Sequence, residues 1–230
     1  MNRTIIVAAA LTLIAGRAAL AADLPPAPGP APQPAPMYVE PVANWSGIYF
    51  GTNGGYGFGS SRWTSSVGLD SSDFGILGAF VGPTLGVNFQ SGAFVFGIEG
   101  DFDGSWLDGT SGASCSPTSC ETKNTWLATA RGRVGYAADN VLFYGTAGGA
   151  YGNIEGNTLG TSFQKESRPG WTAGAGVEVS YADHWTTRFE YLFVDLENAT
   201  LAGGGSAPST TTTVKFNASL IRVGVDYKFR

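Results

Sequence analysis

The sequence predicts an all-β fold: an eight-stranded antiparallel transmembrane β-barrel of the outer-membrane type, with four long external loops and short periplasmic turns. Three observations support this prediction. Long segments alternate apolar and polar residues with period two, their connections alternate between short and long, and aromatic residues cluster at both ends of the segments. In the last segment, Ile221, Val223, Val225, Tyr227 and Phe229 alternate with Leu220, Arg222, Gly224, Asp226 and Lys228.

The chain begins with features of a secretory signal peptide. Arg3 precedes an apolar run that is too short to cross a bilayer as a helix, and Ala19-Leu20-Ala21 fits the small-residue cleavage rule. We expect residues 1–22 to be the signal peptide, with cleavage after Ala21 or Ala22. The stretch "DLPPAPGPAPQPAPMYVEP" begins a Pro-rich periplasmic linker, residues 23–43, and the barrel then occupies 44–230.

The composition excludes two classes of protein. No run of 18 or more apolar residues follows the signal, so the sequence predicts no transmembrane helix. The net charge of −5 gives no reason to expect nucleic acid as a partner. The chain is instead rich in glycine and aromatic residues, with 34 Gly, 14 Phe, 9 Tyr and 6 Trp.

The alternating segments predict eight strands, each longer than an ordinary globular strand. They cover residues 45–58, 73–89, 92–106, 122–137, 141–154, 170–182, 184–197 and 213–229. Tight turns are expected at 90–92, 138–140 and 182–184. Long polar loops are expected at 59–72, 107–121, 155–169 and 198–212, all on the external side.

The two faces of these strands differ, which decides between a membrane barrel and a soluble lipocalin-like barrel. The charged face is also the glycine face, and small residues suit the crowded inside of a narrow barrel. Aromatic residues also form two groups, as at the two membrane interfaces. We therefore expect the apolar face to meet lipid. The predicted interface aromatics are Trp106, Trp126 and Trp171 beside the long loops, and Tyr136, Tyr181, Trp185, Tyr227 and Phe229 at the other end. The faces of 141–154 cannot be assigned from the sequence.

Four motifs resemble a known family. They are "NWSGIYFGTNGGYGFG", "FGIEGDFDGSW", "RFEYLFVDL" and "IRVGVDYKF". Together they make residues 44–230 resemble the small outer-membrane β-barrel proteins of alphaproteobacteria, the surface-antigen group related to haemin-binding porin-family barrels. The resemblance implies an eight-stranded barrel with a periplasmic N-terminus and surface-exposed loops, and some members are described as porins or haemin binders.

The C-terminus departs from this family. Members usually end in Phe, which the barrel-assembly machinery reads as part of a C-terminal signal. Here Arg230 follows Phe229, so the signal is offset by one residue.

The inward charges predict an ion-pair network in the lumen. Five are acidic and five basic: Glu99, Asp101, Glu178, Glu190, Asp226, Arg131, Arg133, Arg188, Arg222 and Lys228. Glu99, Arg131, Glu190 and Arg222 fall at one height, and Arg133, Glu178 and Arg188 fall below them. An unpaired buried charge is costly, so we expect arginines to reach carboxylates on neighbouring strands and close the lumen. The alternative is a wet pore lined by the same residues.

The sequence predicts no enzyme, metal or cofactor. His184, the only histidine, lies in a turn beside Asp183, and Glu99 and Asp101 are better explained by pairing with arginine than as a catalytic dyad. Cys115 and Cys120 are expected to form a small loop disulfide.

Three functions remain open: a structural envelope barrel presenting surface loops, which the sequence favours, a narrow diffusion channel, and loops that bind haem or a host surface. Expected partners are outer-membrane lipid and the barrel-assembly machinery, with peptidoglycan or a host surface as further candidates.

Overall fold

The computed structural model describes residues 43–65, 71–111, 120–158, 164–181, 184–202 and 211–229. All of them belong to one compact unit, Pro41–Arg230. The expected signal peptide and all of the Pro-rich linker except Ala43 lie outside the described residues. Within the described ranges, no helix is long and apolar enough to cross a membrane.

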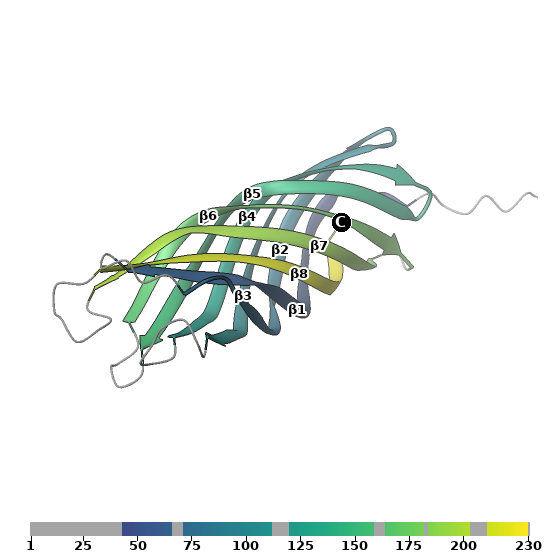
Figure 1. The fold of residues 1–230 in the computed structure, drawn as a ribbon. Helices are drawn as coiled ribbons and strands as arrows, with labels where there is room; N and C mark the ends of the chain where they lie inside the picture. The colour runs from purple at the N-terminus through teal and green to yellow at the C-terminus, as the bar shows by residue number, and fades with distance from the viewer. Residues whose placement is uncertain are drawn as a thin grey trace, which may run out of the picture. The chain divides into compact units, whose positions relative to one another are not determined.

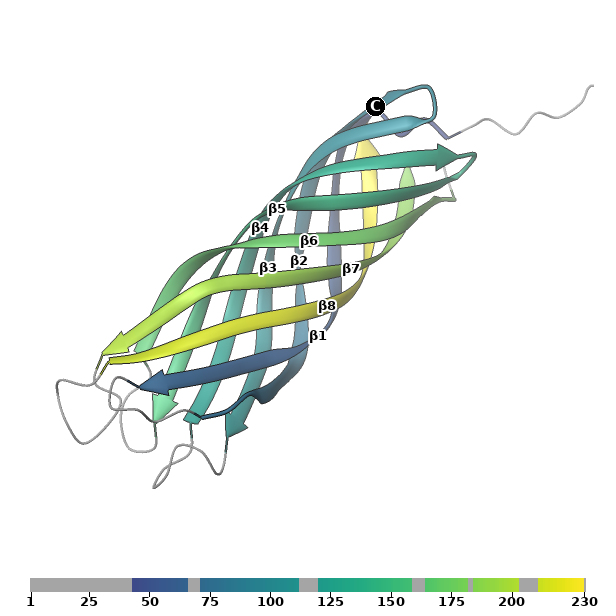
Figure 2. The ribbon, with the colours of Figure 1, turned by 45° about the horizontal axis from the view of Figure 1, so that its top comes forward.

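Eight antiparallel strands close into a barrel in sequence order, with β8 pairing back to β1 (Figures 1 and 2). The strands are β1 (Gly47–Ser65), β2 (Phe74–Ser91), β3 (Phe94–Ser111), β4 (Cys120–Ala138), β5 (Val141–Thr158), β6 (Gln164–Ser180), β7 (Trp185–Ala202) and β8 (Thr211–Phe229). This architecture confirms the predicted eight-stranded barrel. Closure also pairs the edges that an open sheet would expose.

The strands extend further than predicted at one end of the barrel. β1 continues to Ser65 instead of residue 58, and β6 begins at Gln164 instead of residue 170. The predicted loops 59–72, 107–121, 155–169 and 198–212 are therefore shorter. The outward residues at this end are polar, so the alternation of apolar and polar residues that marks a strand fades. The backbone pairing nevertheless continues; Ser65 of β1, for example, pairs with Thr212 of β8. This end is called the loop end below.

The opposite end, called the turn end, carries short connections. Gly92 and Asp139 occupy the turns β2–β3 and β4–β5, with φ angles of 60° and 53°. This left-handed backbone conformation favours Gly, and Asp tolerates it better than most residues. The third predicted turn includes residues 182 and 183, which lie outside the described residues. The barrel begins at Gly47 and ends at Phe229, both at the turn end.

Outward side chains form an apolar band. On β1 it runs from Ile48 (55% exposed) to Phe58 (46% exposed), and beyond it Ser60, Arg62 and Thr64 face outward. Ten residue steps along a strand tilted by about 40° rise roughly 25 Å, which is the height of the apolar band of an outer-membrane barrel. The strands therefore continue past the band as a polar collar at the loop end.

The eight predicted interface aromatics all lie on the outer surface. Trp106, Tyr136, Trp171, Tyr181, Trp185 and Phe229 are exposed. Trp126 and Tyr227 are half-buried because neighbouring rings cover them: Trp126 stacks on Phe102, and Tyr227 meets Trp185 edge to face. Contact of these rings with the membrane interface stays a prediction.

On β5, the strand whose faces the sequence left unassigned, Tyr144 and Gly148 face the lumen and Phe143 and Gly149 face outward. Both faces of β5 carry a mixture of small and aromatic residues, so polarity does not show which face points into the lumen.

This placement predicts opposite outcomes for two adjacent glycines. A Cβ at Gly148 would lie 2.1 Å from the Ala130 carbonyl oxygen, whereas a Cβ at Gly149 would meet nothing within 4 Å. Gly148→Ala should destabilise the barrel by more than ~1 kcal/mol, and Gly149→Ala should be neutral or slightly stabilising because alanine restricts the unfolded chain. Urea unfolding of the two refolded variants measures both effects. Equal losses would contradict this assignment of the two faces.

Candidate functional site

The middle of the lumen holds a cluster of buried charges that we call the ionic layer. None of its members is more than 6% exposed. They are Glu99, Asp101, Asp103, Arg131, Arg133, Glu178, Arg188, Glu190, Arg222 and Asp226. Nine were expected from the sequence to line the lumen near mid-barrel, and Asp103 is the addition.

Two arginines share carboxylates in the half of the layer nearer the loop end. Arg131 donates to Glu190 and Asp101, each at 2.7 Å, and also to Glu99. Arg222 donates from Nε to the same Glu190 oxygen at 2.8 Å, and from Nη2 to the same Asp101 oxygen at 3.2 Å. Each carboxylate is thus held by two guanidinium groups, and such charge-assisted hydrogen bonds offset part of the cost of burying the charges.

Glu99 connects these contacts to the half nearer the turn end. It accepts a hydrogen bond from Arg188 and lies 3.5 Å from Arg133. Arg188 also donates to Asp226 at 3.1 Å, and Arg133 donates to Glu178 at 2.6 Å. The two expected heights are therefore linked into one network.

The pairing follows the expected contacts between neighbouring strands only in part. Arg131 binds Glu99 of the adjacent β3 and Arg222 binds Glu190 of the adjacent β7, but other arginines reach further. Glu178 lies directly opposite Arg188 in the β6–β7 register, yet it binds Arg133 of β4, two strands away. Arg131 of β4 likewise binds Glu190 of β7 across the lumen. An eight-stranded barrel is so narrow that a long arginine spans its interior, so register alone does not determine the partner.

Two tyrosines that the sequence does not predict as site residues complete the network. Tyr49 donates to Glu99 at 2.6 Å and Tyr144 donates to Glu190 at 2.6 Å. The Arg133 guanidinium lies 4.0 Å from the centre of the Tyr144 ring, within cation–π distance. The feature of the sequence that could have identified these tyrosines is an aromatic residue on a strand face that otherwise carries glycine and charged residues.

Lumen-facing glycines make room for these side chains. A Cβ at Gly86 would lie 2.3 Å from the Tyr49 ring, and one at Gly176 would lie 2.6 Å from the Tyr144 hydroxyl. A Cβ at Gly224 would lie 2.7 Å from Nε of Arg188. Glycine is thus required at these positions because larger side chains fill the space beside them.

Lys228, also expected in the ion-pair network, lies nearer the turn end. Its ammonium donates to the Asn44 carbonyl oxygen and lies 5.8 Å from the centre of the Trp45 ring. Trp45 is buried and packs with Val95, Leu142 and Tyr144, a group that we call the turn-end cap. The segment before β1 thus folds into the barrel mouth, where Gln90 accepts a hydrogen bond from the Trp45 backbone at 2.8 Å.

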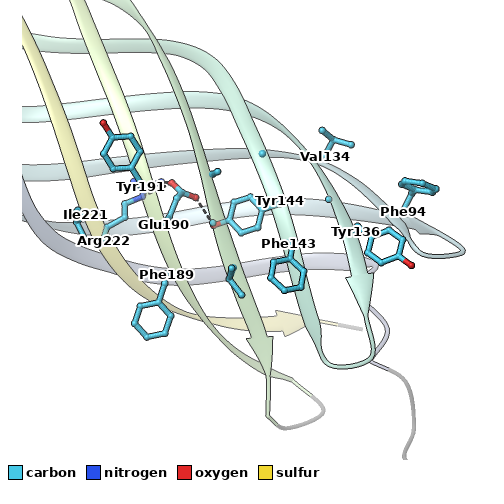
Figure 3. Close-up of a pocket in the computed structure, with 15 residues that line it drawn as sticks. Phe94, Val134, Tyr136, Phe143, Tyr144, Phe189, Glu190, Tyr191, Ile221 and Arg222 are labelled. Atoms are coloured by element: carbon cyan, nitrogen blue, oxygen red, sulfur yellow. Dashed lines mark hydrogen bonds and ion pairs between the residues drawn. The ribbon is translucent and has the colours of Figure 1, made fainter.

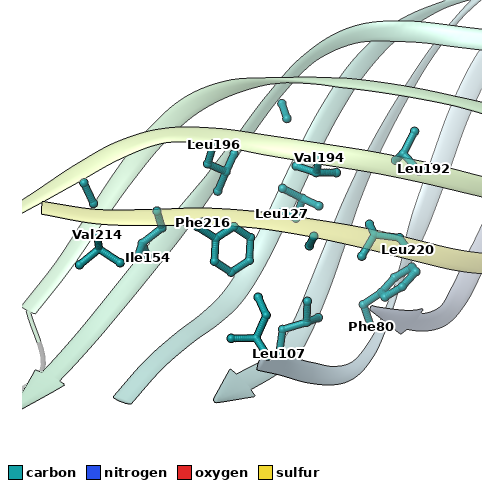
Figure 4. Packing of buried hydrophobic residues seen from close by; sticks show 14 of the residues in the cluster. Phe80, Leu107, Leu127, Ile154, Leu192, Val194, Leu196, Val214, Phe216 and Leu220 are labelled. Carbon is teal, nitrogen blue, oxygen red and sulfur yellow. The ribbon is translucent and has the colours of Figure 1, made fainter. Parts of the chain in front are cut away.

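An apolar layer fills the lumen between the ionic layer and the loop end (Figure 4). The sequence does not predict this layer, because the inward-facing residues that the alternation identifies are mainly charged or small. Its members are Trp63, Ile76, Phe80, Leu107, Leu127, Ala150, Ile154, Leu192, Val194, Leu196, Ala199, Val214, Phe216, Ala218 and Leu220. A cavity within it measures only about 10 Å³, so the layer is closely packed.

A shallow hollow of about 840 Å³ lies on the outer surface of β4–β8 and is also bordered by Phe94 of β3 (Figure 3). Phe143, Phe189 and Tyr191 are exposed around it, while Tyr144 and Glu190, which also border it, are buried. The exposed side chains around it belong to the apolar band.

The remaining expected site residues lie apart from this network. His184 contacts the Lys228 carbonyl oxygen at 3.0 Å and stacks on Tyr227 at the turn end. Cys115 lies outside the described residues, so its disulfide with Cys120 stays a prediction. In the described part of the chain, no group of three or more His, Cys, Asp or Glu side chains could hold a metal ion.

Comparison with known proteins identifies the family. A family model described as the outer membrane protein beta-barrel domain matches residues 7–229. The chain belongs to this family. It is therefore a Gram-negative outer-membrane β-barrel protein, which confirms the predicted location and the resemblance drawn from its four motifs.

Similar proteins are named for the same location. The 25 kDa outer-membrane immunogenic protein of Brucella canis is 37% identical over 231 residues, 99% of this chain and 98% of the relative. The 22 kDa outer membrane protein of Rhizobium leguminosarum bv. viciae is 32% identical, covering 83% and 81%. The crystal structure of OprG from Pseudomonas aeruginosa superposes with a TM-score of 0.54 at 12% identity, over 82% of this chain and 98% of that one, which supports the fold alone.

Proposed function

We propose that this protein is a structural component of the outer membrane, with a closed lumen and loops presented at the cell surface. One observation carries the proposal: three packed layers follow one another along the lumen. The turn-end cap, the ionic layer and the apolar layer are all buried, and the cavity in the apolar layer has room for about one water molecule.

The orientation follows from the barrel family. Outer-membrane barrels place short turns in the periplasm and longer loops outside. In this orientation the Pro-rich linker, which precedes Trp45 at the turn end, is periplasmic, and the polar collar points to the exterior. The immunogenic relatives carry names that fit a protein whose loops reach the cell surface. The proposed partners are outer-membrane lipid and, during biogenesis, the barrel-assembly machinery.

We also propose that the protein has no catalytic activity. Glu99 and Asp101, which could be considered as an acid–base pair, are each bound by arginines and buried below the apolar layer. A general acid or base must reach its substrate. No cofactor is required by this function.

Conductance tests the proposal. Wild-type protein, refolded and reconstituted in a planar bilayer, should show no steady current, whereas an open porin in the same bilayer supplies the positive control. Steady single-channel steps from the wild type would overturn the closed lumen and support the diffusion-channel alternative. Saturable haemin binding by the non-conducting barrel would instead support the ligand-binding alternative.

A further inference from the structure

Small residues form the floor of the hollow on the outer surface of β4–β8. Gly145 of β5 and Ala175 of β6 pair with each other in the sheet, and both face outward. Tyr191 of β7, which pairs with Ala175 on the other side, is 47% exposed, and Phe143 is 53% exposed (Figure 3). Large side chains therefore stand around a floor that lacks them, and this difference in side-chain size produces the hollow of about 840 Å³.

The run of small outward residues continues from the hollow toward the loop end. In the next outward row, Ala147 pairs with Gly132 on one side and with Ala173 on the other. In the row after that, Ala130 pairs with Gly149. The outward surface of β4–β6 therefore stays low for several residue steps beyond the hollow.

The packing of the barrel itself does not account for the outward glycines. A Cβ at Gly145 would lie 3.9 Å from the Gly174 carbonyl oxygen, which is an ordinary contact, and a Cβ at Gly149 would meet nothing within 4 Å. The lumen-facing Gly176 differs, because its Cβ would lie 2.6 Å from the Tyr144 hydroxyl. Glycine weakens a strand, and it marks positions where a ligand or another backbone approaches closely. The outward glycines therefore indicate an occupant on the outside of the barrel.

The chemistry of the hollow favours an apolar occupant. Its two charged lining residues, Glu190 and Arg222, are buried and bind each other on the lumen side of the wall. The exposed side chains around it are aromatic or aliphatic, and the chain is an outer-membrane barrel. Pockets for small ligands measure roughly 300–1,000 Å³, so the volume of the hollow suits part of a lipid molecule.

A flexible acyl chain fits this shape better than a second copy of the barrel. A symmetric dimer brings the same patch of two subunits together, and two facing hollows would enclose a void that forfeits van der Waals contacts. The hollow also reaches the turn end of the apolar band, where it is bordered by Phe94 and Tyr136, whose rings meet edge to face. Tyrosine at the end of an apolar band lies at the depth of the lipid headgroups.

We propose that the hollow binds one acyl chain of a phospholipid from the periplasmic leaflet, with the headgroup beside Tyr136 and the chain over Gly145 and Ala175. Contact of the chain with the surrounding rings and the uncovered backbone supplies the affinity. The choice of leaflet rests on the proposed orientation, which places the turn end in the periplasmic half of the membrane. The site does not depend on a closed lumen.

Retention of phospholipid tests this site. Full-length protein is extracted from membranes in mild detergent and examined by native mass spectrometry, and palmitoyl-oleoyl phosphatidylethanolamine is then titrated onto delipidated protein. The wild type should retain one phospholipid per barrel and bind the added phospholipid saturably. Ala175→Leu fills the floor and should weaken this binding by about tenfold, the effect of losing one or two buried methylene contacts. Folding of the variant is verified by its shift on unheated gels.

Ala79→Leu is the matched control. Ala79 faces outward on β2 beside Tyr56, away from the hollow, so the same substitution should leave phospholipid binding unchanged. A wild type that binds no phospholipid saturably, or equal binding by the wild type and Ala175→Leu, would overturn the site and leave only lipid that coats the whole barrel. Equal weakening in both variants would overturn it as well.

The same spectra identify the occupant. Retained lipopolysaccharide that Ala175→Leu releases would overturn the choice of a phospholipid and contradict the proposed orientation. A dimer that Ala175→Leu dissociates would assign the hollow to a second copy of the chain and overturn the lipid site. Conductance is measured separately, so failure of the lipid site and failure of the closed lumen are distinguishable.

Discussion

Replacing Glu99 with glutamine is expected to lower the free energy of unfolding by about 3–5 kcal/mol. Glu99 is bound by Arg131 and Arg188 and lies 3.5 Å from Arg133, so one substitution removes a negative charge that three buried guanidinium groups share. Glutamine keeps the size of the side chain, which limits the loss to charge and hydrogen bonding. Urea unfolding of refolded protein, followed by the shift of folded barrel on unheated gels, measures the change.

Glu197→Gln is the matched control. Glu197 is an exposed residue of β7, and loss of a surface charge should change stability by less than ~0.5 kcal/mol. If Glu99→Gln were as mild as Glu197→Gln, water would have to reach the ionic layer and screen its charges. That result would contradict a dry lumen and favour the wet-pore interpretation of the same residues.

The strands could be predicted because their two faces meet different surroundings. Ile221, Val223 and Val225 face outward while Arg222 and Asp226 face the lumen, so the alternation is strong. The strand ends could not be predicted, because in the collar both sides of the wall are polar or mixed. The β1 residues Ser60 and Arg62 therefore look like a loop in the sequence although they pair with Asn217 and Lys215.

The charged members of the ionic layer could be identified, but not their partners. The sequence places Glu99 beside Arg131 and Glu190 beside Arg222, and these neighbours do bind. The contacts across the lumen, such as Arg188 to Glu99, depend on the barrel diameter and on where glycine leaves space, as Gly224 does beside Arg188. Neither the barrel diameter nor the space beside a glycine can be inferred from the spacing of residues along a single strand.

The apolar layer could not be predicted for a different reason. Leu220 shares its face of β8 with Arg222, Gly224 and Asp226, and these three residues predict a polar lumen along the whole strand. The inward face in fact changes character along the strand, from Asp226 and Arg222 to Leu220, Ala218 and Phe216. A period-two pattern assigns a residue to a face, but it does not reveal that one face has two successive environments.

Phe216 provides the corresponding test of the apolar layer. Phe216→Ala should lower the free energy of unfolding by about 3–5 kcal/mol, because it removes a buried ring and leaves a cavity that its neighbours cannot fill. Phe189→Ala is the matched control, since Phe189 is 58% exposed on the apolar band and lipid can occupy the space that its ring leaves. The loss at Phe216 should therefore exceed the loss at Phe189 by the cavity contribution, measured by urea unfolding of both refolded variants.

The Phe216→Ala variant also distinguishes the two layers, ionic and apolar, as barriers to ions. Opening the apolar layer at Phe216 leaves the ionic layer intact, because Arg222 and Arg131 still hold Glu190 and Asp101 below it. Ions would have to cross both layers in series, so Phe216→Ala should remain without steady conductance in a planar bilayer although it is less stable. Current through this variant with none through the wild type would mean that the ionic layer passes ions and that the apolar layer alone closes the barrel. If neither protein conducts while the variant shows the expected loss of stability, the ionic layer is a sufficient barrier to ions even when the apolar layer is opened.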